Sequence, residues 1–143
     1  MEPTVHAEQA AALFNGLKGG RLRNISREDN ILRMQILLPQ VASARNPEHS
    51  FFFCTLTGCT RFSLQPFRNT DTRVEVLSTI EKLDMVIHSA SAGPGPVVSV
   101  FCGHKGAEDG ARLTVRAEDF QVWDESFDPV TAQELNRIQK AGS

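Results

Sequence analysis

The chain has 143 residues and a mass of 15.8 kDa, so we expect residues 1–143 to form a single domain around one core. A hydrophobic fraction of 41% and a charged fraction of 22% exclude a disordered or fibrous chain. No run approaches the roughly 20 apolar residues that span a bilayer. The N-terminus lacks the basic segment and apolar core of a signal peptide. We therefore expect a cytoplasmic protein without membrane contact.

Three cysteines are an odd number at low density, unlike the even and dense framework of a disulfide-stapled secreted domain. Reduced thiols, and hence a cytoplasmic location, are the expectation. The composition also suggests a chain that folds without a cofactor.

The net charge of −2 conceals an asymmetry between the two halves. Residues 1–72 hold eight Lys/Arg and six Asp/Glu, whereas residues 73–143 hold seven and eleven. This is too mild for a nucleic-acid binder, which concentrates basic charge on one face. The acidic half suits a basic protein partner, with solvated surface charge as the alternative. The candidate contact residues are Glu118, Asp119, Asp124 and Glu125.

The first predicted element is an amphipathic helix near the N-terminus. Pro3 would lie in its first turn, and the glycine pair at 19–20 would end it. Its apolar face would consist of Ala7, Ala10, Ala11, Phe14 and Leu17.

Alternating residues then predict a hairpin between 21–25 and 31–38, followed by a loop at 39–50 with one helical turn at 41–45. Residues 51–57 predict a third strand, with Phe52, Cys54 and Leu56 on one face and Phe51, Phe53, Thr55 and Thr57 on the other. Gly58 would bend the chain before another strand at 59–65.

The second half continues with weaker and stronger strand signals. Residues 73–84 predict a short strand, 83–87 a better one, and Gly93 to Pro96 a rigid turn before a strand at 98–102. Another turn at 105–110 precedes 113–117 and 120–122, which are either one bent strand or two short ones. Asp128 and Pro129 would begin a C-terminal helix that turns Leu135 and Ile138 toward the sheet.

The predicted elements are therefore six to eight consecutive strands between two terminal helices. Repeated βα units are missing, which argues against a doubly wound nucleotide-binding fold. The fold class we expect is mainly β (α+β), an antiparallel β-sandwich or partly open barrel with a short helix at each terminus.

Candidate chemistry begins with Cys54, Cys59, Cys102 and His104. Four residues separate Cys54 from Cys59, the outer limit of a zinc knuckle, and strand parity sends these two side chains to opposite faces unless Gly58 forms a bulge. Core packing is the preferred interpretation. A Cys102–His104 nucleophile and base is the alternative, but nothing nearby suggests an orienting group or an oxyanion hole. We expect no catalytic, cofactor-binding or metal site.

Nine phenylalanines accompany no tyrosine. Phe51 and Phe53 would lie opposite Phe52 and Cys54, so the strand is either buried on both faces or leaves one face for a partner or a pocket. Burial on both faces is the preferred interpretation. The absence of tyrosine argues further against stacking on nucleic acid.

Four segments carry a resemblance to known proteins: Leu13-Phe14-Asn15-Gly16-Leu17, Gly20-Arg21-Leu22-Arg23-Asn24-Ile25, residues 53–62 (FCTLTGCTRF) and Leu113-Thr114-Val115. In these segments the chain resembles small, mainly uncharacterised bacterial β-rich proteins, some of which are immunity proteins that bind and neutralise a partner toxin. The resemblance spans most of the chain and brings no catalytic motif.

Our leading hypothesis is a non-enzymatic interaction domain, of the immunity type, that binds a protein partner through its acidic region or an exposed strand face. The alternative is a small-molecule binding module with an apolar pocket between β-layers, and an enzyme built on Cys102 and His104 ranks third. The oligomeric state stays open. The candidate pocket residues are Met34, Phe52, Phe62 and Phe101.

Overall fold

The computed structural model describes residue 2 and residues 4–66, 73–104 and 107–141. In this part of the chain nine strands form one antiparallel sheet in the order β4-β7-β6-β5-β1-β2-β3-β8-β9. The strands are β1 (Arg21–Glu28), β2 (Ile31–Leu37), β3 (Phe51–Thr57), β4 (Arg61–Pro66), β5 (Met85–Ala92), β6 (Val97–His104), β7 (Ala107–Arg116), β8 (Asp119–Trp123) and β9 (Pro129–Val130). The helices are α1 (Val5–Gly16), α2 (Pro39–Arg45), α3 (Leu77–Lys82) and α4 (Ala132–Ala141). The predicted mainly β, antiparallel class is confirmed.

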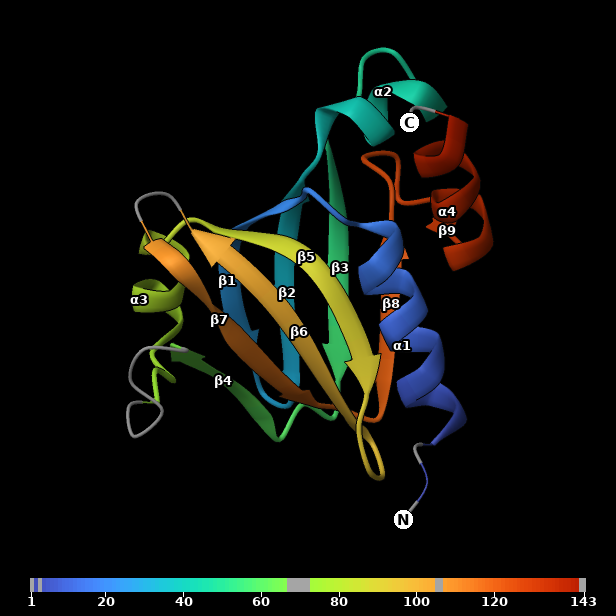
Figure 1. Ribbon diagram of the computed structural model, residues 1–143. Helices are drawn as coiled ribbons and strands as arrows, with labels where there is room; N and C mark the ends of the chain where they lie inside the picture. Colours follow the sequence, from blue (N-terminus) through green and yellow to red (C-terminus); the bar gives the residue numbers. More distant parts are fainter. Residues whose placement is uncertain (1, 3, 67–72, 105–106, 142–143) are drawn as a thin grey trace.

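The sheet is strongly curved, so that its two halves face each other. Figure 1 shows β5, β6 and β7 crossing in front of β1, β2 and β3. The halves are joined where β1 meets β5, with Arg21 opposite Val86, and the sheet does not close into a barrel. Apolar side chains from both halves form one cluster between them, which includes Met34 and Phe52 of one half and Val100 and Leu113 of the other.

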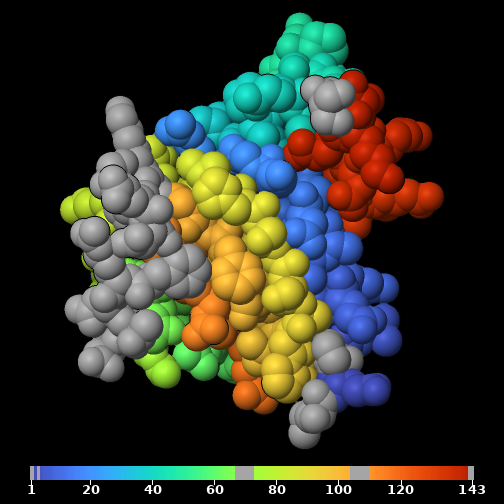
Figure 2. Space-filling model, in the orientation of Figure 1, coloured from blue at the N-terminus to red at the C-terminus, as the bar shows by residue number. Residues whose placement is uncertain are grey.

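Helix α1 packs against the sheet beside β5, β6 and β8. The Thr4 hydroxyl caps the helix by accepting the Ala7 amide at 3.0 Å, as a threonine N-cap does. The Phe14 ring is fully buried and stacks on Phe120 of β8, with 4.4 Å between centroids. In the space-filling view α1 (blue) lies directly beside β5 (yellow), so the helix completes the core along this side (Figure 2).

The two terminal helices meet at Gly16. A Cβ atom at this position would lie 2.6 Å from the Leu135 Cβ of α4, so the close contact requires glycine. The Gln139 side chain fastens the pair by donating to the carbonyls of Gly16 at 3.2 Å and Lys18 at 2.8 Å. The expected helices at both ends are therefore present, and they pack on each other.

The predicted strand at 73–84 is wrong over most of its length. Val74 forms an isolated bridge with Leu64, but the chain then turns into α3, and the fully buried Ile80 anchors this helix to the core. The alternation fails at Leu77-Ser78 because the segment packs by one helical face instead of lying in the sheet.

The predicted helix start at Asp128 and Pro129 is also wrong. Pro129 begins β9, and α4 starts three residues later, where the Thr131 hydroxyl accepts the Glu134 amide at 3.2 Å. The Asp128 carbonyl instead accepts the Asp124 amide and closes the β8–β9 hairpin. A tertiary hydrogen bond thus overrides a local helix-start signal.

Three further predictions concern the extent of a helix and the pairing of strands. The helical turn at 41–45 is longer than expected and forms α2, and residues 113–122 form two separate strands at distant positions in the sheet. Strand β4, although it follows β3 in sequence, pairs with β7 at an edge. The predicted turn at 105–110 is wrong over residues 107–110, which belong to β7. Pro3 and residues 105–106 lie outside the described residues.

None of the described helices combines the length and apolar character needed to cross a membrane.

We predict that Phe14→Ala lowers the free energy of unfolding by about 3–5 kcal/mol, the range for truncating a buried phenylalanine. Chemical denaturation followed by circular dichroism measures this loss. Val5→Ala, at an exposed position of the same helix, is the matched control and should change stability by less than about 0.5 kcal/mol. Equal losses for the two variants would contradict the role assigned to Phe14.

Candidate functional site

The four acidic residues selected from the sequence do not form one patch. Glu118 is exposed and Asp119 half-buried at the start of β8, whereas Asp124 and Glu125 follow its last residue. Five residues of extended chain separate Asp119 from Asp124, about 16 Å at the rise of a strand. The structure therefore divides the acids into two pairs at opposite ends of β8.

Asp124 is buried and bound within the protein. Its carboxylate accepts hydrogen bonds from the Ser126 amide at 2.8 Å, the Asp128 amide at 3.0 Å and Arg45 of α2 at 2.6 Å. The same guanidinium donates to Glu134 of α4 at 2.7 Å. One arginine thus joins α2, α4 and the loop that follows β8, a segment that we call the 124–128 loop.

The protonation equilibria of this cluster follow from its contacts. Burial alone would raise the pKa of Asp124, but hydrogen bonds from the Asp128 amide, Arg45 and the Ser126 amide more than reverse this and hold the pKa below its usual value. Burial alone would lower the pKa of Arg45, yet its hydrogen bonds to Glu134 and Asp124 raise it above its usual value. Both groups are therefore charged at neutral pH.

Glu125 also serves the fold, because its Oε2 atom accepts the backbone amides of Ser50 and Phe51 at 2.5 and 3.3 Å. This contact fixes the start of β3 against the loop. On the other side of the loop, Ser126 Oγ lies 3.4 Å from His49 Nε2. The 124–128 loop is thus held from β3 as well as from α2.

The face of β3 that the sequence left undecided is the outer face of the sheet, and it carries aromatic rings. Phe51 and Phe53 point outward and are half-buried, because Phe52, Cys54 and Leu56 occupy the core side. Phe53 pairs in register with Trp123 of β8. Phe51 packs edge-on against Phe53, with 5.0 Å between centroids. Burial of both faces, the interpretation preferred from the sequence, is therefore wrong.

Phe127 covers part of this surface from the 124–128 loop. Its ring is parallel to that of Phe53, with centroids 4.8 Å apart and an interplanar angle of 4°, yet the residue remains 67% exposed. Because one face of the ring rests on Phe53, the other face is turned toward solvent. We call the four side chains Phe51, Phe53, Trp123 and Phe127 the aromatic platform.

The backbone of Phe127 is strained. Its φ angle is +62°, a left-handed conformation that costs a residue with a side chain about 1–2 kcal/mol. Glycine is the usual residue at such a position in a short hairpin loop. The conformation is imposed by the Phe127 amide donating to the Asp124 carbonyl at 2.9 Å and by the ladder of bonds around Asp124. The backbone strain at Phe127 therefore accompanies an exposed aromatic ring that is held in one position.

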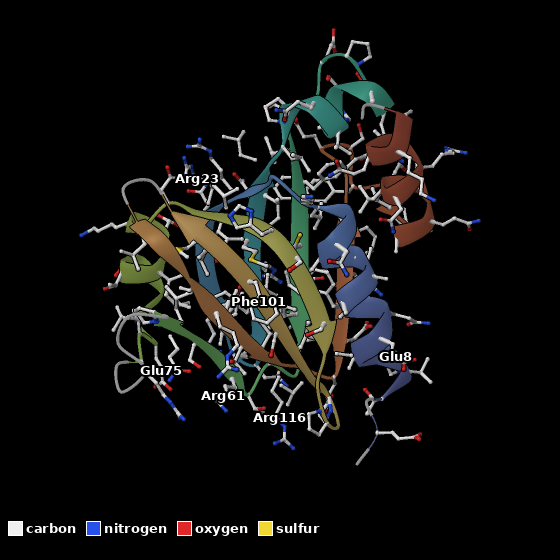
Figure 3. All side chains as sticks on the ribbon, viewed as in Figure 1. Glu8, Arg23, Arg61, Glu75, Phe101 and Arg116 are labelled. Carbon is white, nitrogen blue, oxygen red and sulfur yellow. The ribbon has the colours of Figure 1, made fainter. Side chains whose placement is uncertain are left out.

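The candidate pocket residues lie in two places. Met34, Phe52 and Phe62 are buried in the core, whereas Phe101 is half-buried on the outer face of β6, because Val100 and Cys102 occupy the core side. Figure 3 shows Phe101 in front of the sheet. These four side chains therefore do not share a cavity wall.

Two hollows among the described residues have other linings. An open hollow of about 280 Å³ lies between the end of α1, α2 and α4, and includes Leu38, Val41 and Ile138. A crevice of about 10 Å³, room for about one water molecule, lies beside Phe14 and Phe120. None of the four candidate pocket residues lines either hollow.

The cysteines are buried and chemically quiet. Burial raises the pKa of Cys54, raises that of Cys102 to about 12, and raises that of Cys59 despite the opposing charge of Arg27. A thiol nucleophile needs a depressed pKa and access to substrate, so Cys102 is unsuited to this role. Among the residues that the structure describes, no three His, Cys, Asp or Glu side chains come together as metal ligands.

Sequence reasoning missed Phe127 and Trp123. The signal was present, since Phe127 stands in a polar, acidic loop sequence where an aromatic residue has no core to enter. Its juxtaposition with Phe53 needed the pairing of β3 with β8, which joins segments about 70 residues apart along the chain.

Comparison with protein-family models, with curated proteins and with solved structures finds no match to this chain.

We predict that stability falls on acidification through Asp124. Because the pKa of this group is lowered in the folded state, its contribution is present above the ordinary aspartate pKa of about 4 and is lost as the pH falls through the lower folded value. Asp124→Asn should lower the free energy of unfolding by about 3 kcal/mol at pH 7, because it leaves Arg45 partly unpaired. The difference from the unchanged protein should shrink toward pH 2 in urea denaturation.

Asp128→Asn is the matched control, because Asp128 is exposed and forms no ion pair among the described residues. It should change stability by less than about 0.5 kcal/mol. A pH-independent effect of Asp124→Asn, or equal effects of the two substitutions, would contradict the assignment.

Proposed function

We propose that this protein is a non-enzymatic interaction domain that binds a protein partner through the aromatic platform. The observation that carries the proposal is Phe127, an exposed ring held at a strained backbone position. The stacking of Phe127 on Phe53 only offsets the strain of this backbone position, so the ring brings the fold little net stability. Aromatic side chains are enriched in the energetic centres of protein interfaces. The platform also has the mixed construction of an interface, with polar Thr55 and Gln121 beside the rings.

The fixed position of the Phe127 side chain supports the same proposal. The ring of Phe127 is fixed by stacking on Phe53 and by the 124–128 loop, in which Asp124 forms four hydrogen bonds within the loop and a fifth with Arg45. Binding through a pre-ordered side chain loses less conformational entropy than binding through a mobile one. The platform is therefore suited to a partner that docks without refolding the domain.

The immunity-type role implied by the sequence resemblance is included in this proposal. A bacterial toxin in the cytoplasm, where free thiols such as those of Cys54 and Cys102 persist, would be neutralised by occlusion of its surface. This requires no catalytic group on the present chain. The acidic residues near the platform would speed such an association.

We predict that Phe127→Gly separates stability from function. Glycine relieves the left-handed strain of about 1–2 kcal/mol, whereas loss of the stacked ring costs about 0.5–1.5 kcal/mol. The free energy of unfolding should therefore remain within about 1 kcal/mol of its original value, as measured by denaturation. A loss above about 3 kcal/mol would show that Phe127 serves the fold.

Site-specific photo-crosslinking tests the interaction itself. Benzoylphenylalanine in place of Phe127, in the cell that expresses the protein, should yield one discrete heteromeric adduct. The same group in place of Val76, an exposed residue beside α3 on the opposite side of the molecule from α4, is the control and should not (Figure 1). No adduct at 127, equal adducts at both positions, or an adduct with a second copy of this chain would overturn the proposal.

A further inference from the structure

The chemistry of the partner can be read from the charges around the aromatic platform. The acids Glu125 and Asp128 flank Phe127 within the 124–128 loop, and the exposed Glu48 lies next to His49, which contacts that loop. Among the described residues, none of these three carboxylates forms an ion pair with an arginine or lysine. The rim of the platform beside Phe127 is therefore acidic.

The buried cluster beneath the loop adds to this negative potential. Arg45 supplies one positive charge against the two carboxylates of Asp124 and Glu134. Together the three groups carry a net charge of −1, in a partly buried setting where water screens less. The structural ion pair thus does not neutralise the loop.

On the outer face of the platform's half of the sheet, Arg21 and Arg23 pair with Asp84, and Arg33 pairs with Glu28. Among the described residues, arginines without an ion pair gather instead on the outer face of the other half. Arg61 of β4 lies directly opposite Arg116 of β7, an unfavourable like-charge pair on neighbouring strands, and Arg112 is exposed on the same strand as Arg116. Figure 3 shows Arg61 and Arg116 close together, below Phe101. A basic partner is repelled by this face and attracted to the acidic rim.

We propose that the partner presents an extended cationic segment, and that an arginine side chain of this segment stacks on the free face of Phe127 beside Trp123. Cations placed over aromatic faces are attracted by the ring quadrupole, and the planar guanidinium adds stacking. Asp128 and Glu48 then pair with neighbouring basic side chains. This inference rests on the proposed function and deepens it, because it names what the aromatic platform recognises.

Binding can be followed by intrinsic fluorescence, because Trp123 of the platform is the single tryptophan of the chain. The ligand is an acetylated and amidated peptide of four Gly-Arg repeats, added to the full chain. The matched peptide carries citrulline, a neutral urea of nearly the same shape, in place of every arginine. We expect the arginine peptide to change Trp123 fluorescence and to shift the indole NMR signal in a saturable way, and the citrulline peptide to do neither.

Single substitutions test whether the arginine peptide binds at the aromatic platform. Phe127→Gly should weaken the arginine peptide about two- to fivefold, the equivalent of one exposed cation–π contact. Asp128→Asn should weaken binding and reduce its dependence on salt, whereas Glu75→Gln, which removes the same charge at an exposed position near α3, should do neither. A lysine peptide should bind more weakly than the arginine peptide.

Three results would overturn the inference: equal responses to arginine and citrulline peptides, no effect of Phe127→Gly, or equal effects of Asp128→Asn and Glu75→Gln. The last would mean that only the net charge of the protein attracts the peptide. Crosslinking from position 127 to a cellular protein, combined with any of these results, would leave the proposed function in place and remove the cationic partner. Absence of the adduct would remove the proposed function itself.

Discussion

The carboxylate of Asp124 is the constraint on which the surface architecture depends. It binds two amides of its own loop and the Arg45 guanidinium, which in turn holds Glu134. These contacts fix three segments that are far apart in sequence: α2, the end of β8 and α4. A buried ion pair contributes little net stability compared with apolar packing, but it enforces one geometry because any displacement leaves a charge unpaired. The position of Phe127 is a consequence of that geometry.

The core and the outer surface of the sheet differ in the side chains that they contain. Inside, both halves of the curved sheet and α1 contribute ordinary apolar packing, exemplified by Phe14 against Phe120. Outside, Arg61 and Arg116 on one half form no ion pair among the described residues, whereas on the other half the arginines of β1 and β2 are paired with Asp84 and Glu28 and the acidic loop borders the aromatic rings. In the proposed function, this division orients a cationic partner before contact. Core packing therefore holds the fold, and the aromatic platform consists of side chains that lie outside this core.

Local patterns in the sequence were sufficient where an element makes its own contacts. The alternation in residues 31–38 and 51–57 predicted β2 and β3, and in 51–57 it also predicted which side chains share a face. The apolar spacing from Ala7 to Leu17 predicted α1. Prediction failed where a distant contact decided the structure. The segment containing Ile80 became α3 because it fills the core from outside the sheet, and Pro129 became part of β9 because the Asp128 carbonyl closes a hairpin with Asp124.

The candidate site shows the same limit. Periodicity and charge are properties of neighbouring residues, and they predicted an antiparallel, mainly β chain, the side chains that share a strand face, and an acidic second half. Contacts between distant segments place Phe51 and Phe53 on the outer face, bring Trp123 and Phe127 beside them, and pair Asp124 with Arg45 inside the protein. Strand order and ion pairs bring together residues about 70 or more positions apart, and no local pattern encodes which of these distant residues will meet.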